Sequence, residues 1–212
     1  AAAMALRLKK HVYCEKPLTI QEKDLVEIRE MSLSNPNLVV GYNRRFSSLS
    51  IKAKRIFKER DTPLIINYTI NSSKLNADHW VYDNEEGGGR ILGEMCHFID
   101  FCSYIIGRDC ESVYSKNLAY RDDNFSTLRY SDGSIANITY TTEGDTAKGK
   151  EIIRIIGGGK TVKIIDFKEL HFFTNGKLRY HKSLRRMDKG REQLFNLISD
   201  FDKFESTNII SI

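Results

Sequence analysis

The apolar positions of the first forty residues switch between the period of a helix and the short continuous runs of buried strands. Residues 1–10 resemble the end of an alanine-rich helix, and residues 11–14 form a short β-type run. Thr19 and Glu22 then stand at capping-box spacing ahead of a helical pattern that an Asn-Pro-Asn stretch interrupts. An apolar run at residues 38–40 follows. This helix-strand-helix-strand order predicts the last part of a doubly wound parallel sheet.

After Gly41 the pattern predicts a few helices among many strands. Helical periods occur at residues 47–59, at residues 91–106, which Gly107 closes, and at residues 191–204. Asp132-Gly133 and Asn175-Gly176 are hairpin turn signals between apolar runs. The predicted strands are residues 64–70, 112–117, 125–130, 134–140, 151–156, 161–165, 170–173 and 177–180. The fold class is therefore α+β, with an open, mostly antiparallel β-sheet and helices, preceded by the tail of an α/β unit.

Composition excludes several classes of protein. The chain has 212 residues, of which 41% are hydrophobic and 29% charged, as in an ordinary globular protein. A formal charge of +5 suits an anionic small substrate but falls short of the basic surface of a nucleic-acid binder. No apolar run approaches the length of a membrane span, and the first residues are too short for a signal segment. We therefore expect a cytoplasmic protein.

The four cysteines predict no metal site. They form no CxxC pair and have no histidine-rich partner segment, so we expect no zinc and free thiols in a reducing compartment. Gly157-Gly158-Gly159-Lys160 is reminiscent of a phosphate loop, but a strand pattern follows it where a phosphate loop would open a helix. We interpret it as a β-turn.

Lys16 is the first candidate functional residue. Pro17 disfavours a helical conformation at the preceding residue, so Lys16 is held extended where a parallel strand ends. Open α/β sheets bind ligands at that edge, and a lysine there can stabilise an alkoxide. The alternative is an ordinary surface lysine at a strand-to-helix turn.

His97 is the second candidate. It lies on an apolar, and therefore buried, helix after three glycines, and Glu94 precedes it by one turn on the same stripe. A carboxylate-oriented histidine can take a proton near neutral pH, whereas a lone core histidine is usually structural. His79 and Trp80 stand before the glycines, either as a loop anchor or as a substrate-facing edge.

Together these residues resemble a known family. The segments "KHVYCEKPLT" and "GYNRRF" are similar to the signature of the Gfo/Idh/MocA oxidoreductases, which are NAD(P)-dependent enzymes that act mostly on sugars and cyclitols. The segments "EEGGGRILGEMCHFIDF" and "DNFSTLRYSDGSIANITY" resemble the subgroup often fused behind a zinc-type alcohol-dehydrogenase module and linked with sugar and polysaccharide metabolism. The similarity covers nearly the whole chain.

The resemblance implies a division of the chain and an assembly. Residues 1–42 would be the C-terminal remnant of a Rossmann dinucleotide-binding domain, and residues 43–212 a substrate-binding and oligomerisation domain. Because an open sheet commonly forms the subunit interface in this family, we expect a homodimer or tetramer. The family's glycine-rich GxGxxG loop has no counterpart before Lys16, so we interpret the chain as a fragment of a longer enzyme.

The resemblance also implies site residues. The catalytic group would be Lys16, His97 and Glu94, with NAD or NADP as cofactor. The cofactor would contact Glu15, Lys16, Pro17, Asn43 and Arg44, and a sugar or sugar-nucleotide substrate would contact Arg45, His79 and Trp80. Many relatives carry Asp-x-Gly-x-His, but Gly93 stands in the aspartate's place here, so its role passes to Glu94 or is unfilled.

The predicted function is hydride transfer between the hydroxyl of a sugar, sugar nucleotide or cyclitol and NAD(P). We expect the isolated 212 residues to be inactive without the pyrophosphate-binding unit. The alternative is a non-catalytic binding or assembly module that retains only the substrate domain. Nicotinamide-cofactor binding by the full-length gene product would separate the two.

Overall fold

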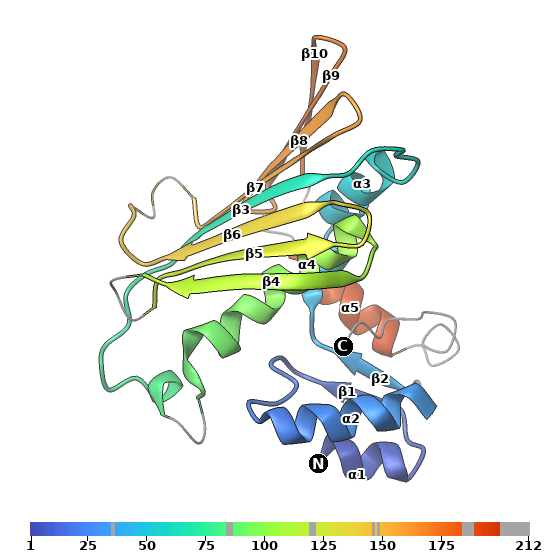
Figure 1. The fold of residues 1–212 in the computed structure, drawn as a ribbon, viewed down its shortest axis with the longest axis vertical. Coiled ribbons are helices and arrows are strands. Elements are labelled where there is room, and N and C mark those ends of the chain that lie inside the picture. The colour runs from blue at the N-terminus through green and yellow to red at the C-terminus, as the bar shows by residue number, and fades with distance from the viewer. Residues whose placement is uncertain are drawn as a thin grey trace.

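The computed structural model of the protein describes residues 1–34, 37–83, 87–118, 122–145, 147, 149–183 and 189–199. A small helix-and-strand unit lies beside a large twisted sheet (Figure 1). The predicted α+β class with a mostly antiparallel sheet is confirmed.

The small unit contains two parallel strands and two helices. Its elements are α1 (Ala2–Arg7), β1 (Val12–Cys14), α2 (Glu22–Ser34) and β2 (Leu38–Val40). Val12 of β1 lies opposite Leu38 of β2, and both pack with Leu6 of α1 and Ile28 of α2 in one buried cluster. The order helix, strand, helix, strand is thus as predicted, because each short apolar run needs a helix to cover it.

The start of α2 differs from the capping-box prediction. The hydroxyl of Thr19 accepts a hydrogen bond from the backbone N–H of Gln21 at 3.0 Å, which closes a local turn before the helix. Because α2 begins at Glu22, that residue occupies the first helical turn and does not stand three positions into a helix capped by Thr19.

Eight strands form the large sheet, in the order β10-β9-β8-β7-β3-β6-β5-β4. All neighbours run antiparallel except β3 and β6, which are parallel. The strands are β3 (Ile65–Asn71), β4 (Cys110–Asn117), β5 (Asn124–Tyr130), β6 (Ile135–Thr141), β7 (Glu151–Gly157), β8 (Lys160–Ile165), β9 (Glu169–Thr174) and β10 (Lys177–Lys182).

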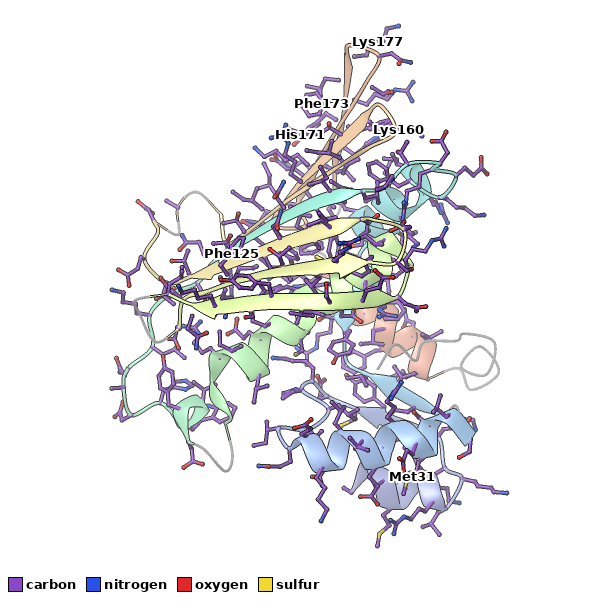
Figure 2. The ribbon with its side chains drawn as sticks, viewed as in Figure 1. Met31, Phe125, Lys160, His171, Phe173 and Lys177 are labelled. Carbon is purple, nitrogen blue, oxygen red and sulfur yellow. The ribbon has the colours of Figure 1, made fainter. Side chains whose placement is uncertain are left out.

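Helices cover one face of this sheet and leave the other face exposed. Alternation along the strands points Tyr68 of β3 inward, where it packs edge-on against Phe98 and Phe101 of α4 (Cys96–Ile106). Helix α3 (Ser48–Ile56) contributes Leu49 and Ala53 to the same core. The opposite face carries outward residues such as Phe125, His171 and Phe173 (Figure 2).

Short helical segments complete the chain. They are η1 (Asn43–Phe46), η2 (Trp80–Tyr82), the π-helical turn η3 (Ile91–Met95) and the last helix, α5 (Arg191–Ile198). The predicted helix at residues 91–106 is therefore a π-helical turn followed by α4, because backbone bonding changes from i→i+5 to i→i+4 at Cys96. Helix α5 ends at Ile198, and residues 200–204 of the predicted helix lie outside the described residues.

The predicted turns have the geometry that their sequences favour. Asn175 and Gly176 both have positive φ, 50° and 69°, and join β9 to β10 as a two-residue hairpin. Gly158 and Gly159 do the same between β7 and β8, so this glycine-rich segment is a hairpin turn as predicted.

Within the described residues no helix is long and apolar enough to cross a membrane. No group of three or more His, Cys, Asp or Glu side chains in that part of the chain is placed to hold a metal ion.

Candidate functional site

The carboxyl ends of β1 and β2 open into a cavity of about 260 Å³. Because the two strands are parallel neighbours, the residues that follow them emerge at one edge of the small sheet, where α/β sheets bind ligands. Helices α4 and α5 close the other side. The lining residues are Tyr13, Glu15, Gly41, Asn43, His97, Arg191 and Leu194.

Glu15 occupies the strand side of this cavity. The Tyr13 hydroxyl donates a hydrogen bond to Glu15 Oε1 at 2.7 Å, and burial together with this carboxylate raises the pKa of Tyr13. A Cβ on Gly41 would lie 2.8 Å from Glu15 Oε2, so a larger residue at this position would have to displace the Glu15 carboxylate. The glycine therefore lets the end of β2 approach the carboxylate closely.

Lys16 links the small unit to the helix that carries the histidine. Its ammonium group donates a hydrogen bond to the carbonyl of Gly93 at 2.7 Å, within the π-helical turn η3. Its charge contributes to lowering the pKa of His97. Pro17, in contrast, lines a separate cavity of about 640 Å³ beside α1 and α2, together with Cys14 and Ile28.

His97 is buried, with 8% of its surface exposed, and lines the cavity from the first turn of α4. Its ring packs edge-on against Tyr42 at 6.2 Å between centroids. Its Nδ1 has no hydrogen-bond partner among the described residues. Burial lowers the pKa of His97, and the charges of Arg44 and Lys16 lower it further, so the free imidazole is neutral at pH 7.

Glu94 contacts other groups than His97. Its carboxylate accepts a hydrogen bond from the Tyr140 hydroxyl at 3.1 Å and lies 3.5 Å from Arg90 and 3.8 Å from Lys150. The helical stripe that placed Glu94 beside His97 assumed uniform α-helical spacing, but Glu94 belongs to the π-helical turn. The structure therefore directs Glu94 towards β6, and no carboxylate of the described residues partners the ring of His97.

Arg44 lies in a buried ion-pair network. Its Nε and Nη2 donate to the two oxygens of Glu151 at 2.8 and 2.9 Å, and its guanidinium stacks on the Phe98 ring at 5.0 Å. Tyr68 and Lys189 donate to the same carboxylate at 2.5 Å each. Burial raises the pKa of Glu151, but Arg44 and Lys189 more than offset this and hold it below its usual range.

The remaining predicted residues fall in two places. Asn43 lines the cavity, and its Nδ2 donates to the carbonyl of Lys189 at 2.9 Å. Arg45 is bound by both oxygens of Asp100 on α4. His79 and Trp80 lie on the long segment after β3: the His79 Nδ1 accepts from the N–H of Val81 at 3.2 Å, and Trp80 is 64% exposed. Neither of the last two lines the cavity beside His97.

Three residues of this region escaped the sequence analysis: Glu151, Lys189 and Arg191. Glu151 carries a recognisable signal, because it shares the inward stripe of β7 with Ile153 and Ile155. A charge at an inward strand position requires a buried partner. Lys189 and Arg191 carry no such signal, since only the packing of α5 against η1 brings Arg191 to the cavity and Lys189 to Asn43 and Glu151.

Several sequence relatives of the chain are named as oxidoreductases, and one, which is 27% identical over 82% of this chain and 49% of that protein, is named as the 2,7-anhydro-N-acetylneuraminate hydratase of Escherichia coli. No protein-family model matches the chain. It is 28% identical to the uncharacterised oxidoreductase YrbE of Bacillus subtilis over 64% of this chain and 40% of that protein. It is 28% identical to myo-inositol 2-dehydrogenase of Thermotoga maritima over 55% of this chain and 35% of that protein. The chain thus spans less than half the length of these curated relatives.

Solved structures give the same fold. A dehydrogenase from Clostridium difficile superposes with a TM-score of 0.74 at 21% identity, over 98% of this chain and 67% of that one. An inositol dehydrogenase homologue from Azotobacter vinelandii, complexed with NAD+, gives a TM-score of 0.72 at 17% identity, over 85% of this chain and 53% of that one. The chain therefore shares the α+β fold of these solved structures.

Proposed function

We propose that the chain is the substrate-binding part of an oxidoreductase that moves a hydride between a sugar, sugar-nucleotide or cyclitol hydroxyl and NAD or NADP. The observation that supports this most is the convergence of Glu15, Asn43 and His97 on one cavity, with Lys16 alongside. That cavity lies at the edge where parallel sheets bind cofactors.

The residues present fit the nicotinamide end of such a cofactor. The buried Nδ1 of His97 is destabilising while it has no hydrogen-bond partner, and a bound ligand would supply the missing hydrogen bond. Glu15, Lys16 and Asn43 would hold this end of the cofactor. When bound, it supplies the hydride acceptor.

Residues of the chain itself would accept the proton that the substrate hydroxyl loses and stabilise the charge on its oxygen. His97 is neutral, so its lone pair can accept the proton of the substrate hydroxyl. The Lys16 ammonium would stabilise the oxygen as negative charge develops on it. Arg44 would act indirectly, because it is held by Glu151 and only its field reaches the imidazole.

The test is turnover by the full-length gene product with His97→Gln. We expect turnover to fall by about 10²–10⁴, the usual contribution of a positioned acid or base. His171→Gln is a matched control on the outward face of β9, and it should keep normal turnover.

The pH profile provides a second readout. Because the pKa of His97 in the empty site is far below its ordinary value, kcat/KM should show no histidine limb between pH 5 and 8. Near-normal turnover in His97→Gln would remove His97 from the mechanism. Failure of the full-length protein to bind either cofactor would favour the non-catalytic module instead.

A further inference from the structure

A second cavity, of about 870 Å³, lies between α3, the end of β10 and α5. It is separate from the cavity beside His97, and α5 contributes to both, through Gln193 here and Arg191 there. The charged side chains that line this second cavity, Lys52, Arg55 and Lys182, are all basic, and the imidazole of His181 lies among them.

These basic groups have no carboxylate partners among the described residues. Elsewhere in the chain arginines pair with acids, as in Arg44 with Glu151, Arg45 with Asp100 and Arg60 with Asp132. Glu169 lies opposite Lys182 across the β9–β10 ladder, but its nearest ion-pair partner is His171 at 3.5 Å. Within the part of the chain that the structure describes, the cavity therefore concentrates positive charge without an acidic counter-charge.

Two of the groups are held in contact from different elements. Lys52 Nζ, on α3, lies 3.0 Å from His181 Nδ1, on β10. At this distance the ring nitrogen accepts from the ammonium group, so His181 is neutral. Burial lowers the pKa of His181, and Lys52 and Arg179 lower it further. An anion in the cavity would offset these positive charges and raise the pKa of His181.

The rest of the lining indicates a small molecule with an apolar or planar part. Leu49, Ile51 and Ile56 of α3 line one side, and Tyr180, which is 50% exposed, lines the other. The volume falls within the ordinary range of small-molecule sites. Phosphate groups match the charged side, because each carries up to two negative charges and three acceptor oxygens.

We propose that this cavity binds a phosphorylated small molecule, with a diphosphate group held by Lys52, Arg55 and Lys182 and an apolar or planar part against Tyr180. The site is independent of the hydride-transfer proposal, because none of its residues lines the cavity beside His97.

The test is calorimetric titration of the full-length protein with inorganic pyrophosphate, ADP and UDP. We expect Lys52→Met and Lys182→Met each to weaken binding by about tenfold, the usual loss for one charge-assisted hydrogen bond. Lys177→Met is the matched control, since Lys177 stands at the far end of the same strand, at the tip of the β9–β10 hairpin (Figure 2). It should leave the affinity unchanged. Having two variants on different elements guards against a folding defect in one.

The imidazole of His181 reports on the same event by NMR. Its pKa should rise when pyrophosphate binds, because the anion offsets the field of Lys52. Tighter binding of ADP or UDP than of pyrophosphate would support contact with Tyr180, and equal binding would support recognition through the diphosphate alone. Absence of binding by all three probes, or equal weakening by Lys177→Met and Lys52→Met, would overturn the proposal.

Discussion

Replacing Glu151 by glutamine should destabilise the fold far more than a typical loss of an ion pair. The Glu151 side chain has no exposed surface, and it accepts hydrogen bonds from Arg44, Tyr68 and Lys189. These donors come from η1, β3 and the segment before α5, so one carboxylate joins three parts of the chain. Glutamine keeps the volume but removes the charge.

The size of the loss in stability follows from the state of Arg44 in the Glu151→Gln variant. Arg44 is 6% exposed and would remain buried without its counter-charge. Breaking a buried pair by removing one partner costs about 3–5 kcal/mol, because the other charge stays desolvated. We therefore expect the free energy of unfolding of Glu151→Gln to fall by this amount. The double variant Arg44→Met/Glu151→Met should recover part of it, since neither charge is then buried.

Urea denaturation at several pH values measures the difference in the free energy of unfolding between wild type and Glu151→Gln. Its pH dependence tests the sign of the electrostatic contribution of Glu151. Because the pKa of Glu151 is depressed in the folded state, its ionised form stabilises the protein above the unfolded pKa of about 4.3, and that stabilisation is lost as pH falls through the folded value. The difference between wild type and Glu151→Gln should be constant above about pH 5.5 and shrink below about pH 4.3.

Glu27→Gln provides the control for this experiment. Glu27 also pairs with an arginine, Arg7, but both side chains are exposed, at 37% and 65%. An exposed pair contributes about 0–1 kcal/mol, so this variant should be nearly as stable as wild type. The reasoning would be refuted if Glu151→Gln cost no more than Glu27→Gln, or if its effect grew as the pH fell.

Two further predictions concern a glycine and the open sheet. Gly190→Ala should lower the free energy of unfolding, measured by urea denaturation, by about 3 kcal/mol or more, because φ is +80° and a Cβ would lie 2.3 Å from the carbonyl of Asn43. Gly176→Ala should lower it by about 1–2 kcal/mol, because φ is +69° there and a Cβ would meet nothing within 4 Å. Equal losses of stability in the two variants would contradict the packing argument. We also propose that the exposed sheet face forms a homodimer or tetramer: Ile65 and Phe173, which are 48% and 41% exposed in one row across the strands, would be buried there. Replacing both by lysine should lower the mass found by analytical ultracentrifugation, and a monomeric wild type would count against this interface.

Local patterns in the sequence were sufficient to predict most of the secondary structure. Alternation along β3 and β6 and the turn signals at Asp132-Gly133 and Asn175-Gly176 set the strands and hairpins, because side-chain period and turn chemistry act over a few residues. The sequence also placed Lys16 after the end of a strand and His97 on a buried helix.

Contacts between distant segments had to come from the tertiary structure. Uniform helical spacing paired Glu94 with His97, whereas the π-helical turn directs Glu94 to Tyr140. The motif that suggested a cofactor contact for Arg44 could not reveal Glu151, which lies 107 residues later in the chain. A buried arginine needs a carboxylate partner, and which carboxylate lies within reach of Arg44 depends on how β7 and η1 pack. Local sequence therefore determined which helix, strand or loop carries each charged side chain. The packing of the sheet, η1 and α5 determined which of these side chains contact one another.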